Sequence, residues 1–190
     1  MEEKLNQSGE IHFFKNLPHS LVISIIGLLA LGGCASPASH QSMIPTDFDV
    51  VRKHPATVNV ATSGGRETEA IGKSQISNET LAKALTEAIT KSQTFSRVVQ
   101  GDGADYLLTV SIFSIEQFSF GLSYLVKMEV GWTLKRADTD KIVWQEAIKS
   151  EHTATPGDAF AAVKRLRLAT EGAARNNIAQ GLAKISKLTL

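Results

Sequence analysis

The sequence has little cysteine, little net charge and no apolar run long enough to span a bilayer comfortably. Its 190 residues include a single cysteine, Cys34, so no intramolecular disulfide can form. The 20 lysines and arginines nearly balance the 19 aspartates and glutamates, and a chain this close to neutral has no large field to attract nucleic acid. We therefore expect no nucleic-acid partner and a fold that is stabilised by packing.

Motifs that carry chemistry are also scarce. After residue 33 the histidines are His40, His54 and His152, and none is spaced as a metal-binding pair. The serines show no Gly-x-Ser-x-Gly elbow around a nucleophile. Asp102 and Asp105 flank a glycine in a turn, where aspartate commonly binds backbone groups. We expect no catalytic residue, no metal and no cofactor, and hence no enzyme.

What the sequence does contain is an apolar amino-terminal run that ends near the cysteine. Residues 21–31 carry no charge, and as a helix they would measure about 17 Å, against roughly 30 Å of hydrocarbon in a bilayer. The small residues Gly32 and Gly33 follow, as in the cleavage region of a secretory signal. We predict a cleaved signal peptide over residues 1–33. The alternative is a core helix or strand with Cys34 as an ordinary buried thiol.

The residues Leu31, Gly32, Gly33 and Cys34 resemble the lipobox of bacterial lipoproteins. The resemblance implies cleavage before Cys34 by signal peptidase II and acylation of that cysteine by palmitate or similar fatty acids, so that lipid ties the mature protein to a membrane. In such lipoproteins an aspartate after the cysteine favours the inner membrane. Because Ala35 stands there, the resemblance implies the periplasmic face of the outer membrane.

After the cysteine the chain is predicted to form a tether and then one domain. Residues 34–54 are interpreted as the lipidated cysteine and a flexible tether, because Ser, Pro, Ala, Gln and His dominate from Ala35 to about Thr46. A dozen extended residues would reach at most roughly 40 Å. Residues 55–190 are enough for a single hydrophobic core.

Within residues 55–190 two periodicities alternate. Apolar residues at every second position predict strands over 56–61 and 122–134. Strands are also predicted over 95–99, 106–115 and 141–151, next to turn residues. Helical spacing predicts one helix over 78–92, capped by Ser77, and another that opens at Thr155 or Asp158, includes Phe160 and runs nearly to the end. The order β-α-β-β-β-α predicts an α+β two-layer sandwich, a mostly antiparallel sheet with two helices on one face.

Several of these segments together resemble the small α/β domain of certain envelope lipoproteins. They are LAKAL at 81–85 with FSRVV at 95–99, ADYLL at 104–108, and the turn from Asp138 into Ile-Val-Trp at 142–144. The group includes the YajG-like lipoproteins, the lipopolysaccharide-assembly accessory lipoprotein and the amino-terminal domain of TolB. The resemblance implies a non-catalytic accessory or adaptor in envelope assembly or maintenance, with an envelope protein as partner. Acyltransferases of lipid A synthesis resemble hexapeptide-repeat β-helices, and this chain has no such repeat.

The link between the third and fourth strands offers a candidate contact surface. Phe118 and Phe120 stand beside Gly121, and a short turn there would project both rings at a hairpin tip, to suit a partner groove or a lipid interface. The alternative is that the rings fold back onto the core.

Other readings stay open from the sequence alone. The face of the fourth strand that carries Leu125, Lys127, Glu129 and Thr133 either lies against a partner or meets water. As a whole, the domain could instead hold a lipid or glycan between its helices and its sheet, or be an enzyme whose site leaves no signature in sequence.

Overall fold

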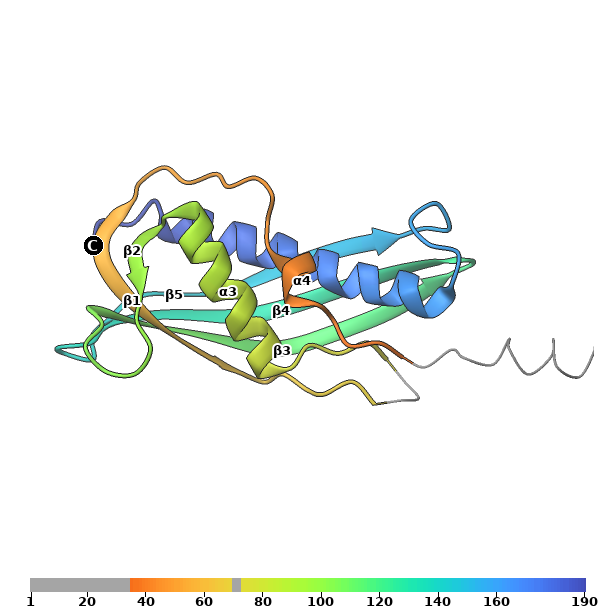
Figure 1. Ribbon diagram of the computed structural model, residues 1–190, viewed down its shortest axis with the longest axis horizontal. Helices are drawn as coiled ribbons and strands as arrows, with labels where there is room; N and C mark the ends of the chain where they lie inside the picture. The colour runs from red at the N-terminus through yellow and green to blue at the C-terminus, as the bar shows by residue number, and fades with distance from the viewer. Residues whose placement is uncertain (1–34, 70–72) are drawn as a thin grey trace, which may run out of the picture. The chain divides into compact units, whose positions relative to one another are not determined.

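The computed structural model describes residues 35–69 and 73–190. The predicted signal peptide, the lipobox and Cys34 lie outside this part of the chain. The elements follow one another as shown in Figure 1: α2 (His40–Met43), β1 (His54–Ser63), α3 (Asn78–Ser92), β2 (Phe95–Val98), β3 (Tyr106–Phe120), β4 (Ser123–Arg136), β5 (Ile142–Ala154) and α4 (Ala162–Ile185).

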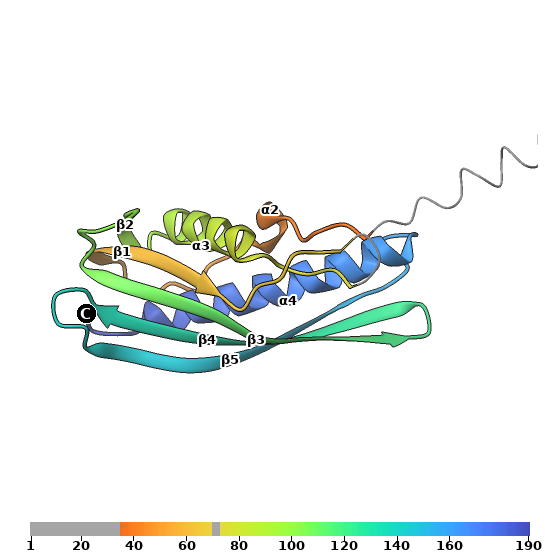
Figure 2. The same cartoon turned by 90° about the horizontal axis from the view of Figure 1, so that it is seen from below.

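The five strands form one sheet in the order β2-β1-β3-β4-β5. β1 is parallel to both of its neighbours, whereas the long pairings of β3 with β4 and of β4 with β5 are antiparallel. α3 packs on β1 and β2, and α4 packs on β4 and β5, so that the helices form a second layer on one face (Figure 2). The predicted α+β two-layer sandwich is confirmed, with the short α2 as an addition.

The core lies between these two layers. On β4 the alternation predicted from the sequence is confirmed from residue 126 onward, where every second side chain is buried: Val126, Met128, Val130, Trp132 and Leu134. Leu122, which the same period assigned to the buried face, is exposed in the hairpin turn. α3 begins where its cap was predicted, because the Ser77 side chain accepts a hydrogen bond from Thr80 N–H at 3.2 Å. α4 comes close to the sheet at Gly181, where an added Cβ would lie 2.4 Å from Cζ2 of Trp132.

β3 runs past its predicted end at residue 115. The prediction stopped short because a bulge reverses the alternation of inward and outward side chains within the strand. The register with β4 shifts between Ile112 and Ser114, so that the neighbours Phe113 and Ser114 both line the outer face of the sheet. After the bulge the inward positions include Gln117, which is polar. The period of two therefore disappears from the sequence although the strand runs on to Phe120.

The prediction of a flexible tether is wrong for residues 35–46. Met43 and Ile44 are buried, and α2 packs against α3 and α4. Ala38 N–H donates to the carbonyl of Gln75 at 3.3 Å, and Ser39 N–H donates to Glu171 Oε1 at 2.8 Å. The composition of this segment was misleading because a few well-placed apolar side chains are enough to bury it, while partners far away in sequence bind its backbone.

The last helix begins later than predicted. Asp158 Oδ2 accepts hydrogen bonds from Thr155 N–H and Oγ1 at 2.7 and 2.8 Å, so these two residues close a local turn and do not cap a helix. α4 starts at Ala162, and Phe160 lies in the preceding loop, outside the apolar stripe to which its spacing had assigned it. No helix in residues 35–69 or 73–190 is both long enough and apolar enough to cross a bilayer.

Candidate functional site

The β3–β4 hairpin exposes apolar side chains at its tip. Its last pairs are Phe118 with Leu125 and Phe120 with Ser123, and Gly121 takes the left-handed conformation in the turn, at φ +57°. Phe118 is 39% exposed, Phe120 63% and Leu122 69%. Both phenylalanine rings are therefore exposed at the hairpin tip, and they do not fold back onto the core. Contact of these rings with a partner or with lipid stays a prediction.

A second apolar projection, which the sequence analysis missed, lies beside the hairpin. β5 ends at Ala154, which pairs with Tyr124 close to the hairpin turn, and the loop that follows carries Phe160, whose side chain is 100% exposed. The pair Pro156-Gly157 favours a turn, and it could have indicated that a loop precedes α4. The helical spacing of Phe160 with later apolar residues concealed it.

Arg165 fixes this loop onto the sheet. Its Nη1 donates hydrogen bonds to the carbonyls of Ala159 and Phe160 at 2.8 and 2.5 Å. Its guanidinium lies 5.9 Å from the centre of the Tyr124 ring on β4, a distance at which a cation is attracted to the ring face. The buried arginine thus holds the backbone of Phe160 in place while the Phe160 ring points into solvent.

The amino-terminal segment reaches the body at the same end. The carbonyl of Ser36 accepts a hydrogen bond from Ser74 Oγ at 3.2 Å, and the carbonyl of Ser74 accepts one from Gln117 Nε2 at 2.6 Å. Gln117 directly precedes Phe118 in β3. In Figures 1 and 2 the first described residues lie toward the same end as the hairpin tip and the loop before α4.

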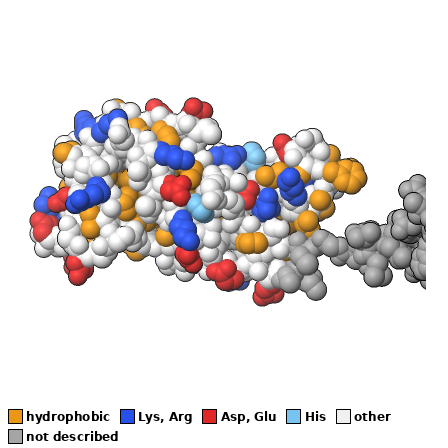
Figure 3. All heavy atoms as spheres, viewed as in Figure 1, with side chains coloured by type: hydrophobic (Ala, Val, Ile, Leu, Met, Phe, Trp, Pro, Cys, Tyr) orange, Lys and Arg blue, Asp and Glu red, His pale blue; other side chains and the backbone are white. Residues whose placement is uncertain are grey.

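We call this region the apolar end and define it by Phe118, Phe120, Leu122 and Phe160. Apolar side chains are exposed at this end in the space-filling view (Figure 3). Charges of both signs lie in this region: Lys127 Nζ lies 5.9 Å from the centre of the Phe118 ring, and Asp158 lies exposed in the loop of Phe160. The apolar end therefore offers aromatic surface without a strong field.

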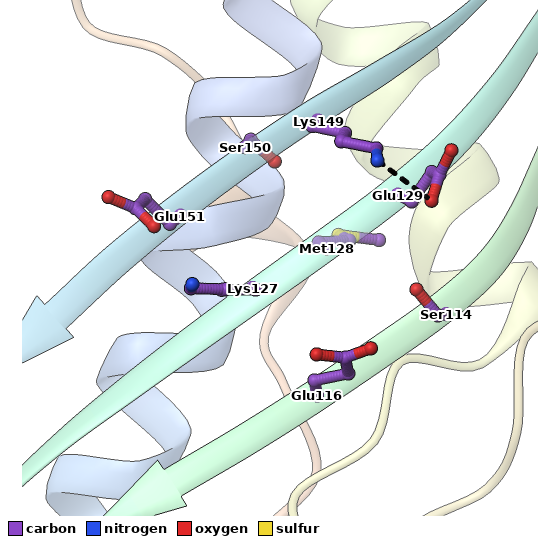
Figure 4. Close-up of a pocket in the computed structure, with 8 residues that line it drawn as sticks. All are labelled: Ser114, Glu116, Lys127, Met128, Glu129, Lys149, Ser150 and Glu151. Atoms are coloured by element: carbon purple, nitrogen blue, oxygen red, sulfur yellow. Dashed lines mark ion pairs between the residues drawn. The ribbon is translucent and has the colours of Figure 1, made fainter.

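The outer face of the sheet is a separate surface of mixed charge. A hollow of about 390 Å³ on β3, β4 and β5 is bordered by Glu116, Lys127, Glu129, Lys149 and Glu151 (Figure 4). Lys149 Nζ lies 3.8 Å from Glu129 Oε2. The hollow is open to solvent and its charges alternate in sign, as on a solvated sheet face. The structure thus places Lys127 and Glu129 of the second candidate surface on the face of the sheet opposite the described helices.

The remaining candidates for chemistry serve the fold. Asp105 Oδ2 accepts hydrogen bonds from both Thr57 N–H and Thr57 Oγ1 at 2.7 Å, and these bonds lower the pKa of Asp105. Asp105 thus joins the start of β3 to β1. His54 is buried with Nε2 3.0 Å from the Ile185 carbonyl. In the described part of the chain no three His, Cys, Asp or Glu side chains are placed to hold a metal.

His152 has an altered acidity because of its position beneath α4. Its ring occupies the space that a Cβ on Gly172 would need. Burial lowers the pKa of His152 below the usual 6.5, and the positive charge of Arg175 lowers it further, while Asp158 acts in the opposite direction. Burial and Arg175 both favour the neutral form of the ring, which suits a packing role.

No family model and no curated protein matches the chain. Among solved structures, a protein from Xanthomonas campestris described as family DUF330 has a TM-score of 0.55 at 13% identity, covering 80% of this chain and 93% of that one. A hypothetical protein from Chlamydia trachomatis has a TM-score of 0.50 at 9% identity, covering 69% and 98%. A candidate lipoprotein from Caulobacter crescentus has a TM-score of 0.49 at 18% identity, covering 68% and 87%.

The Xanthomonas and Chlamydia structures share the fold of this chain. Identities this low show the fold alone. Neither of these two structures is described as a YajG-like, lipopolysaccharide-assembly or TolB protein, so the narrower resemblance stays a prediction.

Proposed function

We propose that this chain is a non-catalytic lipoprotein of the bacterial envelope. In this proposal acyl chains on Cys34 anchor it to the periplasmic face of the outer membrane, where it serves as an accessory or adaptor for an envelope protein in assembly or maintenance. The sequence supports the anchor through the apolar run at 21–31 and through the lipobox-like residues Leu31, Gly32, Gly33 and Cys34.

One observation carries the proposal further than the sequence did. Cys34 stands two residues before Ser36, whose carbonyl is hydrogen-bonded to the body through Ser74. Two residues span at most about 7 Å, so an acylated Cys34 would hold the body directly on the leaflet. An adaptor held this close to the membrane is suited to a partner that is itself in or at the membrane.

The filled interior favours an adaptor over the ligand-binding alternative. The helix–sheet interface contains large side chains that are less than 2% exposed, among them Trp132, Leu134, Ile178 and Leu182. Trp132 Nε1 donates to Asn177 Oδ1 at 2.9 Å, so the polar atom of the largest of these side chains is satisfied internally. A lipid or glycan between the layers would have to displace this packing.

The anchor is tested by mass analysis of the full chain made in a bacterium with two membranes. We expect the mature protein to begin at Cys34, to carry acyl chains and to fractionate with the outer membrane. The variant Ala35→Asp should keep the acyl mass and move to the inner membrane. An uncut leader with a free thiol would overturn the anchor.

The adaptor role needs a separate experiment. We expect crosslinking in intact cells, followed by purification from detergent extracts, to recover a defined envelope complex that is lost when Cys34→Ala prevents anchoring. Recovery of the lipidated protein as an unaccompanied monomer would contradict the adaptor role while leaving the anchor in place.

A further inference from the structure

We propose that the apolar end is a second membrane contact, with Phe118, Phe120, Leu122 and Phe160 seated in the lipid interface of the leaflet that holds the Cys34 anchor. The inference rests on the proposed function, because it requires the acyl anchor to hold the body at a membrane. It adds an orientation, in which the sheet points its β3–β4 hairpin at the lipid.

The first argument is where the chain leaves the described structure. Ser36 is joined through Ser74 to Gln117, and Gln117 is the residue before Phe118. An acyl chain on Cys34, two residues from Ser36, would thus enter the membrane beside the hairpin. Of the surfaces on this body, the apolar end is the one that this anchor brings to the lipid.

The second argument is the chemistry of the exposed side chains. Three phenylalanines and one leucine are exposed on two separate projections, whereas ordinary surfaces expose apolar residues singly. Aromatic rings are enriched at the boundary between headgroups and acyl chains. Since charges of both signs surround these rings, the contact depends on apolar surface and does not require anionic lipid.

The third argument is that both projections are held in place. β3 pairs with β4 as far as Phe120 and Ser123, at the hairpin turn. On the other projection, Arg165 binds the carbonyls of Ala159 and Phe160. The rings are therefore presented to a flat surface before any contact forms, so little conformational freedom is lost on contact.

The test places a tryptophan at the apolar end and another at a matched site. Phe120 and Phe113 are both 63% exposed on β3, but they lie seven residues apart, about 20 Å along the strand. The lipidated full chain carrying Phe120→Trp or Phe113→Trp is placed in vesicles of phosphatidylcholine with or without bromine on the acyl chains. Phe160→Trp, on the other projection, is an independent second probe. All variants should unfold at the wild-type temperature.

Each variant contains three tryptophans, of which Trp132 and Trp144 are common to all. We expect brominated lipid to remove roughly a third of the emission of Phe120→Trp and Phe160→Trp, and much less from Phe113→Trp, since the quencher acts only within the bilayer. Equal quenching of Phe120→Trp and Phe113→Trp would overturn the proposal, as would no quenching of Phe120→Trp and Phe160→Trp.

Flotation of the same vesicles separates the two levels of inference. If the protein floats but the tryptophans at the apolar end are not quenched, the anchor stands and the second contact is wrong, in which case the apolar end is free to meet a protein. If the lipidated protein does not float with vesicles, the anchor itself fails, and the proposed function with it.

Discussion

The carboxylate of Glu171 on α4 accepts a hydrogen bond from the backbone N–H of Ser39 at 2.8 Å. Glu171 is only 1% exposed, and its Oε1 also lies 3.5 Å from Arg167 Nε. This oxygen therefore helps to hold the amino-terminal segment against the last helix, together with the hydrogen bond from Arg175 Nη1 to the Ser42 carbonyl. Together with the hydrogen bond from Ser74 Oγ to the Ser36 carbonyl, this contact keeps the start of the described chain against the body.

Removing that acceptor should loosen the segment. Glu171→Leu leaves the Ser39 N–H and the Arg167 guanidinium without their partner, and we expect a loss of about 1–3 kcal/mol in the free energy of unfolding by urea. Limited proteolysis should then cut residues 35–46 faster than in the wild type. Glu171→Gln keeps a side-chain oxygen at this place and serves as the matched variant. Equal proteolysis of wild type and Glu171→Leu would show that the segment is held by other contacts.

The amino-terminal segment also shows where sequence reasoning fails. Its average composition is that of a linker, and the residues that bury it, Met43 and Ile44, are adjacent, so they produce no periodic pattern. The partner that binds Ser39 is 132 residues away. No local rule contains that pairing, because it exists only once α4 has packed on the sheet.

Elements with a strong period of their own were predicted well. The helix over 78–92 was predicted to the residue, because Ser77 supplies a cap and the apolar spacing is regular. The candidate site was predicted in part: Phe118 and Phe120 lie at an exposed hairpin tip, as one alternative held. Phe160 was misassigned, because its three-residue spacing from Val163 imitates a helix that in fact begins at Ala162.

Asn177 and its neighbour Asn176 allow a matched comparison inside and outside the core. Asn177 is buried, where Oδ1 accepts from Trp132 Nε1 and Nδ2 donates to the Ile148 carbonyl, both at 2.9 Å. Asn176 makes one exposed bond, to the Glu151 carbonyl. We expect Asn177→Ala to cost about 1–3 kcal/mol in urea unfolding, because the buried indole N–H loses its acceptor, and Asn176→Ala about 0.5 kcal/mol or less. Equal losses of unfolding free energy in the two variants would show that the buried hydrogen bonds of Asn177 contribute no more than the exposed bond of Asn176.

Replacing Gly181 by alanine would have two opposite effects on stability. Alanine in its place would favour the helix by about 1 kcal/mol. Its Cβ, however, would lie 2.4 Å from Cζ2 of Trp132, a rigid ring that is fully buried. We expect the clash to prevail and Gly181→Ala to lower the free energy of unfolding by about 1–3 kcal/mol.

Gly157 provides the control for this substitution. Its Cβ would meet only Thr155 Oγ1, at 3.5 Å, so Gly157→Ala should leave the unfolding midpoint in urea nearly unchanged. A Gly181→Ala protein that is as stable as the Gly157→Ala protein would mean that α4 can move away from Trp132.

The partly buried ring of His152 predicts how stability changes with pH. Burial, and then Arg175, lower the pKa of His152 in the folded state below 6.5, so below that pH the unfolded chain binds more protons than the folded chain does. The contribution of His152 to stability is therefore complete above about pH 6.5 and is lost as the pH falls from there through the lowered folded pKa. Urea unfolding at pH 7.5 and 5.5 should show a larger loss for the wild type than for His152→Gln, which cannot titrate. The aspartates with lowered pKa, Asp105, Asp138 and Asp158, titrate further toward acid and are common to both proteins. The same loss in both proteins would mean that the ring is hydrated when the protein is folded.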